Sequence, residues 1–373
     1  MILTQCAVCA TELGLTLGKK CGRCSTRYCG AECQKKHWEE GGHDKLCKQI
    51  KKAGGAEQYN ANKRYTEAVV VAAEACAEDT KGQTCFICTQ ALHWKTKEGL
   101  VRGCACRGTA GFAHVSCLAE QAKILLAEAE ENNLGAKVLD ERYRRWYACS
   151  MCEQEYHGVV RCALGWACWK TYLGRPETDQ FRSNAMGLLG MGLASAGHLA
   201  DALTVQEAEL AMTRRLGESE DAILVVQGNL ASTYSMLGNI EKALSMERDV
   251  YSGRLKLHGE EDSNTLRAAG NYAVSLHDLQ RFEEAKSLFR KTIPVARRTL
   301  GEENVLTLRM RWTYARVLYL DEGASLDDLH EAVATLESVA HLWKRIFGPA
   351  HPETQKAQEA LKGAREALAK GGV

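Results

Sequence analysis

Residues 174–373 repeat a pattern of small apolar positions set among polar ones. Each repeat unit ends with a pair of residues whose second member is glycine. These pairs recur at intervals of 42, 42 and 47 residues. Each unit carries two small residues 12 positions apart, or 17 in the last unit, where "DEGAS" adds five. A small residue on each of two helices lets them cross at close range, so the pattern predicts four helix pairs. The pairs of small residues are Gly190 and Ala202, Ala231 and Ala243, Ala273 and Ala285, and Ala315 and Ala332.

The N-terminal part has shorter apolar stretches. "VVRCALGWACWKTYL" (159–173) predicts an apolar helix, and "LAEQAKILLAEAEENN" and "VLDERYRRWY" predict two more helices. No apolar run reaches the 18 residues that would suggest a membrane span, and "AVVVAAEACA" (68–77) is too short. The N-terminus also lacks the pattern of a signal peptide. We therefore expect a soluble cytoplasmic or nuclear protein with no membrane partner.

The 42-residue period resembles the tetratricopeptide repeats (TPRs) of kinesin light chains, as do "GNLASTYSMLGNIEKAL" and "NYAVSLHDLQRFEEAKSLFRKT". The resemblance implies an α-solenoid of four helix pairs and a capping helix, whose inner face comes mainly from the first helix of each pair. Asn229 and Asn271, 42 apart, match positions where such repeats hold the backbone of a bound peptide. Alternatively, these asparagines bond the local backbone at a helix end.

Cysteine usage divides the chain near residue 170. All 17 cysteines lie between Cys6 and Cys168, and the remaining 205 residues contain none. A reducing compartment does not support a disulfide framework, so the regular spacings favour metal ligation. Cys76, Cys162 and Cys168 fall outside these spacings, and we interpret them as buried small apolar residues.

The first cluster contains seven cysteines and one histidine, enough for two closed and therefore structural zinc sites. A two-residue gap lets both sulfurs of a turn reach one zinc, and a three-residue gap does so on a helix. His37 is a rival ligand, but using it would leave Cys47 without its partner. We therefore favour His43 and expect His37 on the outer face of a short helix. The pairs are Cys6 and Cys9, Cys21 and Cys24, Cys29 and Cys33, and His43 and Cys47.

The spacing alone leaves sequential and interleaved pairing open. However, "YCGAECQKKHW" followed by "HDKLC" resembles the MYND zinc finger over residues 6–47. The resemblance implies Cys6, Cys9, Cys29 and Cys33 on one zinc, and Cys21, Cys24, His43 and Cys47 on the other. Residues 1–65 carry twelve Lys or Arg against six Asp or Glu, but seven thiolates on two zinc ions add a formal charge of −3. We therefore expect protein partners rather than nucleic acid.

The second cluster, residues 85–152, again holds seven cysteines and one histidine. It reads Cys85-x2-Cys88-x15-Cys104-x-Cys106-x7-His114-x2-Cys117-x31-Cys149-x2-Cys152. The one-residue gap and the seven residues before the histidine resemble the RING-CH finger more than a PHD finger or a common RING. The resemblance implies Cys85, Cys88, His114 and Cys117 on one zinc, and Cys104, Cys106, Cys149 and Cys152 on the other. The 31-residue spacer exceeds the usual length.

These patterns predict a mostly α protein, in which two zinc-stabilised cross-brace modules precede an α-solenoid of TPR helix pairs. Neither finger can bury a sufficient core alone, so we expect four structural zinc ions per chain. The expected domains are a MYND-type finger (1–50), a linker with a helix (51–82), a RING-CH-like finger with a helical insertion (83–158), a bridging helix (159–173) and a TPR array (174–373).

The sequence contains no catalytic constellation of its own. It lacks the Asn-His-x-Cys stretch of SET methyltransferases, and "LHGE" (257–260) lacks the cysteine pair of zinc deaminases. One hypothesis is a RING-type ubiquitin ligase, which recruits a charged conjugating enzyme and acts by positioning it. Ile87 lies between the first ligand pair, where RING-type fingers contact that enzyme. The other hypothesis is a non-catalytic scaffold that binds proteins or peptides through the TPR groove and the MYND finger.

Overall fold

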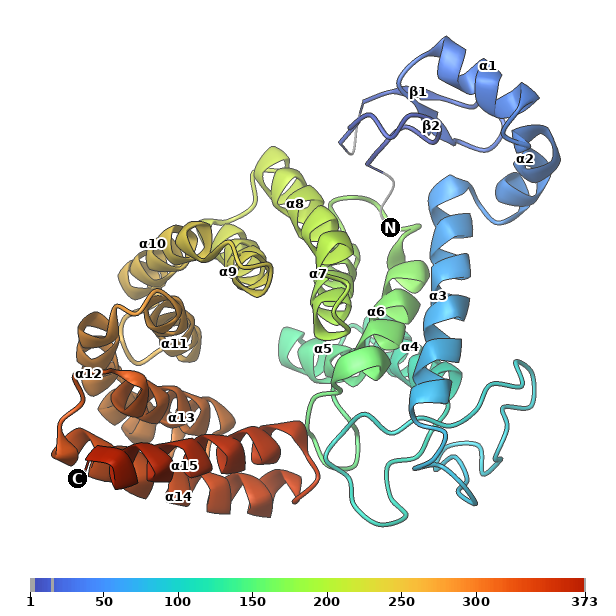
Figure 1. The fold of residues 1–373 in the computed structure, drawn as a ribbon. Helices are drawn as coiled ribbons and strands as arrows, with labels where there is room; N and C mark the ends of the chain where they lie inside the picture. Colours follow the sequence, from blue (N-terminus) through green and yellow to red (C-terminus); the bar gives the residue numbers. More distant parts are fainter. Residues whose placement is uncertain (1–3, 15–16, 372–373) are drawn as a thin grey trace. The chain divides into compact units, whose positions relative to one another are not determined.

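The computed structural model describes residues 4–14 and 17–371 of the 373-residue chain. Within that part the protein is mainly helical, with fifteen α-helices, one 3-10 turn and one two-stranded sheet (Figure 1). The chain forms two compact units, Met1–Glu218 and Ser219–Val373.

The first finger opens the first unit with short elements. These are β1 (Lys19–Lys20), β2 (Arg27–Tyr28), α1 (Ala31–Glu39) and α2 (His43–Lys52). β1 and β2 pair antiparallel, with Lys19 opposite Tyr28. Among the described residues, the buried apolar cluster here has only four members besides cysteines: Leu13, Tyr28, Ile50 and Ala56. So small a core cannot stabilise a fold without further cross-links.

The second finger is built mostly from loops and two helices. Its elements follow α3 (Ala56–Ala75) and comprise α4 (Val115–Glu131), α5 (Ala136–Tyr143) and the 3-10 turn η1 (Arg144–Trp146). An isolated antiparallel bridge joins Val101 to Ala113. α4 begins directly after His114 and carries Cys117 in its first turn. The helices predicted between Cys117 and Cys149 are therefore present as α4 and α5.

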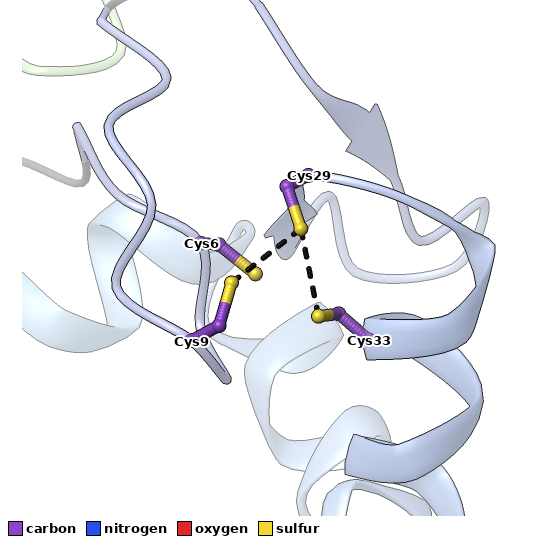
Figure 2. Close-up of side chains that lie close together, drawn as sticks. All are labelled: Cys6, Cys9, Cys29 and Cys33. Carbon is purple, nitrogen blue, oxygen red and sulfur yellow. Dashed lines mark hydrogen bonds between the residues drawn. The ribbon is translucent and has the colours of Figure 1, made fainter.

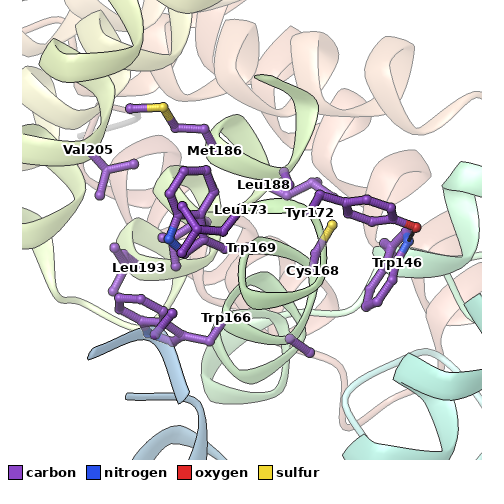
Figure 3. Packing of buried hydrophobic residues seen from close by; sticks show 14 of the residues in the cluster. Trp146, Trp166, Cys168, Trp169, Tyr172, Leu173, Met186, Leu188, Leu193 and Val205 are labelled. Atoms are coloured by element: carbon purple, nitrogen blue, oxygen red, sulfur yellow. Dashed lines mark hydrogen bonds between the residues drawn. The ribbon is translucent and has the colours of Figure 1, made fainter. Parts of the chain in front are cut away.

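α6 (Gly158–Tyr172) lies at the centre of the first unit, and ten of its fifteen residues are buried. It packs against α3 and α4 and against α7 (Gln180–Ser195), which packs on α8 (Leu199–Arg215). Trp166, Trp169 and Tyr172 contribute to one shared apolar cluster (Figure 3). A Cβ on Gly192 would lie 2.9 Å from the carbonyl oxygen of Arg161, so only glycine permits this α6–α7 approach. The core thus joins the second finger to the first two repeat helices.

The cysteines outside the regular spacings belong to this part of the fold. Cys162 and Cys168 are buried on α6, and Cys76 is half-buried at the end of α3. Burial raises the pKa of all three thiols, that of Cys162 to about 11. They therefore remain protonated at neutral pH, and Cys162 and Cys168 pack as small apolar side chains.

The second unit is a succession of packed helices. They are α9 (Glu220–Met236), α10 (Ile240–His258), α11 (Ser263–Asp278), α12 (Phe282–Leu300), α13 (Val305–Leu320), α14 (Leu326–Phe347) and α15 (Pro352–Gly371). The small residues predicted at the crossings, such as Ala231 and Ala243, are completely buried. α9 and α11 lie on one side of this unit and α10 and α12 on the other (Figure 1). The predicted fold class, zinc-binding modules followed by helix pairs and a capping helix, is confirmed.

A buried lysine of α12 holds the "DEGAS" insertion in place through an ion pair with its first residue. Lys286 has a side chain only 4% exposed, and its Nζ lies 2.7 Å from Asp321 Oδ2 and 2.9 Å from Glu283 Oε1. Burial alone would lower the pKa of Lys286, but these carboxylates outweigh burial and raise it. Ser325 and Asp328 then form a capping box that begins α14.

Within the described residues, none of the helices combines the length and the apolar character that crossing a membrane would require.

Candidate metal centres

Sixteen cysteine and histidine side chains gather into four groups of four. Within each group the potential ligand atoms all lie within 4.8 Å of one another. Figure 2 shows the first group, in which the four sulfurs point toward one another. Each group could hold one zinc ion, and the grouping is the interleaved one that the two resemblances imply. The groups are Cys6, Cys9, Cys29 and Cys33; Cys21, Cys24, His43 and Cys47; Cys85, Cys88, His114 and Cys117; and Cys104, Cys106, Cys149 and Cys152.

The distances between ligand atoms fit tetrahedral zinc. With zinc–sulfur bonds of about 2.3 Å, two sulfurs of a tetrahedral site lie about 3.8 Å apart, and a sulfur and a nitrogen slightly closer. The observed separations match these edges: Cys9 to Cys29, 3.5 Å; Cys21 to Cys47, 3.9 Å; Cys106 to Cys149, 3.7 Å; Cys24 to His43, 3.4 Å. Four protein ligands fill a tetrahedral site, so such zinc would be structural and would offer no position to a substrate.

All four Cys-x2-Cys pairs share one backbone turn, which we call the knuckle. The N–H of Cys6 donates to the carbonyl of Thr11 at 2.8 Å, and the N–H of Ala10 donates back to Cys6 at 3.1 Å. The same two bonds recur in the pairs that begin at Cys21, Cys85 and Cys149. The residue after the second cysteine has a left-handed φ of 56° to 61° in each: Ala10, Ser25, Thr89 and Glu153. The spacing thus acts through a turn that points both sulfurs to one side.

In the first finger, His43 and not His37 joins the second group. His43 is buried, with Nε2 facing Cys24, and its Nδ1 has no hydrogen-bond partner among the described residues. The expectation that His37 lies on the outer face of α1 is wrong. Its Nδ1 lies 3.0 Å from the Tyr28 hydroxyl, and its ring centroid is 4.8 Å from that of His43. Burial lowers the pKa of both imidazoles, which are therefore neutral at pH 7.

In the second finger, His114 is oriented from both sides of its ring. Nδ1 lies 3.4 Å from Cys88 Sγ and 3.6 Å from Cys117 Sγ. Nε2 lies 3.3 Å from the carbonyl oxygen of Ala91, to which it can donate. A metal-binding histidine commonly donates its second ring nitrogen in this way, which fixes the tautomer. Burial lowers the pKa of His114 and keeps the imidazole neutral, as zinc ligation requires.

Two threonines support the cysteines of the first finger, and sequence reasoning missed them. The hydroxyl of Thr11 lies 3.0 Å from Cys9 Sγ, and that of Thr26 lies 3.1 Å from Cys24 Sγ. Hydroxyl donation by Thr11 lowers the pKa of the Cys9 thiol to about 6 and so favours the thiolate that binds zinc. The sequence does indicate this support, because a threonine stands two residues after the second cysteine in both pairs.

The candidate partner-binding residues are members of none of the four metal groups. Ile87 is half-buried between Cys85 and Cys88, and its N–H donates to Cys85 Sγ at 3.4 Å. Asn229 and Asn271 are half-buried on α9 and α11. Neither asparagine side chain makes a hydrogen bond within the described part of the chain. The alternative, in which these amides bond the local backbone, is therefore not observed among the described residues.

Comparison with protein-family models identifies the modules. Residues 6–47 match the MYND finger, residues 85–133 match the RING-variant domain, and residues 224–264 and 265–305 match tetratricopeptide repeats. The RING-variant match ends before Cys149 and Cys152, the pair that the long spacer sets apart. No match to this chain was found among curated proteins.

Two solved structures resemble the chain over much of its length. One is the crystal structure of a substituted form of the Podosopora anserina kinesin light chain nearly identical TPR-like repeats, which is 18% identical. The alignment covers 62% of this chain and 97% of that one, with a TM-score of 0.39. The other is the crystal structure of BtubC (BKLC) from P. vanneervenii, which is 14% identical, with 69% and 91% covered and a TM-score of 0.37.

The family matches and the four groups define a class. The chain is a multidomain protein that carries a MYND finger, a RING-variant finger and tetratricopeptide repeats, with Cys/His groups that could each bind a zinc ion. Modules of these kinds support a role in protein–protein interaction.

Proposed function

We propose that this protein is a RING-type ubiquitin ligase. Its second finger recruits a charged ubiquitin-conjugating enzyme, and its repeats and MYND finger hold the substrate. The observation that carries the proposal is the RING-variant match over residues 85–133, with Ile87 between the first two ligands. Such a ligase needs no nucleophile of its own, because it accelerates transfer by bringing two reactants together.

Ile87 has the properties of a small apolar docking contact. It is half-buried, packs at the edge of the finger's apolar cluster and lies on a knuckle fixed by the N–H donation to Cys85. A fixed turn loses little conformational freedom on binding, so burial of the side chain that it carries contributes efficiently to affinity. Residues 83–158 form the conjugating-enzyme module in this proposal, and zinc in the four groups holds both fingers in shape.

The repeats supply the second half of the proposal. The amides of Asn229 and Asn271 are half-buried and make no hydrogen bond to the described residues, so they are suited to bond the backbone of an extended peptide. Arg267 lies one turn before Asn271 on α11, and Arg309 holds the equivalent place on α13, 42 residues on. Both arginines are exposed, and neither forms an ion pair with the described residues. These cations favour a peptide that carries carboxylates.

A non-catalytic scaffold is the second candidate, and one observation favours it. The RING-variant match stops at residue 133, and α5 occupies the long spacer before Cys149. An altered spacer can remove part of a conjugating-enzyme surface while leaving the zinc sites complete. In this alternative all three modules bind proteins, and the surface that carries Asn229 and Asn271 is the main functional site.

An autoubiquitination assay with a panel of conjugating enzymes separates the two candidates. The ligase proposal predicts ubiquitin chains on the full-length protein with at least one enzyme, and loss of that signal after zinc removal. Absence of transfer with every enzyme, from protein that retains its zinc, would leave the scaffold. Binding of acidic peptides that Asn229→Ala and Asn271→Ala weaken would then define its function.

A further inference from the structure

The second finger contains a fifth knuckle that has no cysteine. The N–H of His93 donates to the carbonyl of Glu98 at 3.0 Å, and the N–H of Lys97 donates back to His93 at 2.9 Å. Lys97 adopts φ 60°, the left-handed value found at the same place in the four cysteine knuckles. The segment 93–98 therefore repeats the backbone of a metal-binding turn with histidine and threonine in place of the two cysteines.

Hydrogen bonds hold this knuckle where metal would hold the others. His93 Nδ1 accepts the N–H of Thr96 at 3.1 Å and lies 2.8 Å from the Thr96 hydroxyl. Thr96 is bonded in turn to the carboxylate of Glu98 at 3.1 Å. That carboxylate accepts the N–H and the hydroxyl of Ser116, in the first turn of α4, at 2.7 and 2.8 Å. The knuckle is thus fixed to the body of the finger without a metal ion.

The knuckle presents apolar and basic side chains to solvent. Trp94 at its tip is 68% exposed, and the preceding Leu92 is 59% exposed. Lys95 and Lys97 are exposed too, and neither forms an ion pair with the described residues. A tryptophan this exposed on a rigid turn is unusual, because its large apolar ring gains free energy from burial. We call this surface the tryptophan knuckle; it comprises Leu92, Trp94, Lys95 and Lys97.

We propose that the tryptophan knuckle is a second contact for the conjugating enzyme, which extends the surface begun by Ile87. The inference rests on the proposed ligase function. The two contacts belong to one part of the finger, because the His93 ring lies 5.3 Å from that of His114, which groups with the cysteines flanking Ile87. The partner surface that fits is an apolar pocket for Trp94 bordered by carboxylates that face the two lysines. Tryptophan anchors of this kind dominate small interfaces, and rim charges set the choice of partner.

The test measures discharge of ubiquitin from charged conjugating enzymes to free lysine, with the full-length, zinc-loaded protein. Trp94→Ala should lower the rate at subsaturating conjugating enzyme about tenfold or more, the loss typical of a buried tryptophan anchor. The K95E/K97E variant should change which enzymes of the panel are active and should weaken the dependence of the rate on salt. Leu17→Ala is the matched control, since Leu17 is equally exposed, at 68%, but lies in the first finger.

The outcomes distinguish docking at the tryptophan knuckle from the ligase function itself. If Trp94→Ala retains four zinc ions and the full rate with every enzyme that the unmodified protein uses, the tryptophan knuckle is not a docking contact, while the ligase function stands. If the unmodified protein discharges none of the enzymes, both proposals fall. Vesicles of phosphatidylcholine with phosphatidylserine provide a further arm. Co-sedimentation that Trp94→Ala abolishes, with discharge unchanged, would assign the surface to an anionic membrane instead.

Discussion

The rings of Tyr143 and Phe181 stack with their centroids 5.7 Å apart. Tyr143 belongs to α5, in the spacer of the second finger, and Phe181 belongs to α7, the first helix of the predicted repeat array. The same cluster contains Leu126 of α4 and Trp169 of α6. The finger and the first helix pair therefore share one apolar core, and what stabilises the finger also stabilises that pair.

This shared core predicts the result of zinc removal. A structural zinc site contributes on the order of 10 kcal/mol or more, which is comparable with the whole stability of a domain. A strong chelator should therefore unfold Met1–Glu218 as a unit, including α7 and α8, while Ser219–Val373 keeps its helices. Hydrogen exchange read by mass spectrometry checks this, because α7 should lose protection and α13 should keep it. Protection of α7 that survives complete zinc removal would show that its core is independent of the finger.

Single ligand substitutions should leave the other finger intact. Cys29→Ser and Cys117→Ser each remove one of four ligands, so zinc should fall from four ions to two or three per chain. Because α4 begins at the site that contains Cys117, Cys117→Ser should also loosen α4, and Cys29→Ser should not. Elemental analysis combined with hydrogen exchange measures both effects. Loss of protection in the second finger after Cys29→Ser would mean that the ligand groups are wrong.

The sequence predicted the candidate ligand residues and the helix pairs because both follow from spacing along the chain. The interleaving came from the two family resemblances, and the small residues at crossings such as Ala231 and Ala243 marked the helix pairs. Features that depend on tertiary packing could not be predicted from spacing. The inward turn of His37 follows from its bond to Tyr28, and the stacking of Tyr143 on Phe181 depends on how α5 meets α7. The knuckle at His93 contains no cysteine, so the Cys-x2-Cys spacing does not predict it.

A buried acid in the first unit makes its stability dependent on pH. Glu209 on α8 is 5% exposed, its Oε2 has no hydrogen-bond partner among the described residues, and its Oε1 faces Gly187. Burial raises the pKa of this carboxyl from 4.5 to about 8. The folded state therefore holds a proton that the unfolded chain releases above pH 4.5, so stability falls as the pH rises from 4.5 to about 8.

Replacing Glu209 by glutamine should remove this loss of stability at higher pH. At pH 7 the pH exceeds the ordinary carboxyl pKa of 4.5 by 2.5 units, so Glu209→Gln should stabilise the first unit by about 3 kcal/mol. The gain should be absent at pH 4. Urea unfolding at the two pH values measures it, with exposed Glu218→Gln as the control. Equal stability of Glu209→Gln and the unmodified protein at pH 7 would contradict a neutral buried carboxyl.

The lysine that fixes the "DEGAS" insertion should be important for the second unit. Lys286→Ala leaves Asp321 without its closest partner, and breaking a largely buried ion pair in this way costs about 3 kcal/mol. Thermal unfolding should show the loss in the transition of Ser219–Val373, while the transition of the first unit stays unchanged. Lys291→Ala, at an exposed position of the same helix, is the matched control. A loss no larger than that of the control would mean that the insertion holds its place without the ion pair.

In the proposed ligase, the second finger docks the charged conjugating enzyme at Ile87. The most direct measurement is ubiquitin transfer by Ile87→Ala, with zinc counted in the same preparation. Ile87 coordinates no metal, so the variant should retain four zinc ions. Loss of a buried isoleucine contact is worth about 1.5–3 kcal/mol, so transfer should fall tenfold or more. Transfer by Ile87→Ala that equals that of the unmodified protein, at full zinc content, would rule out docking of the conjugating enzyme at Ile87.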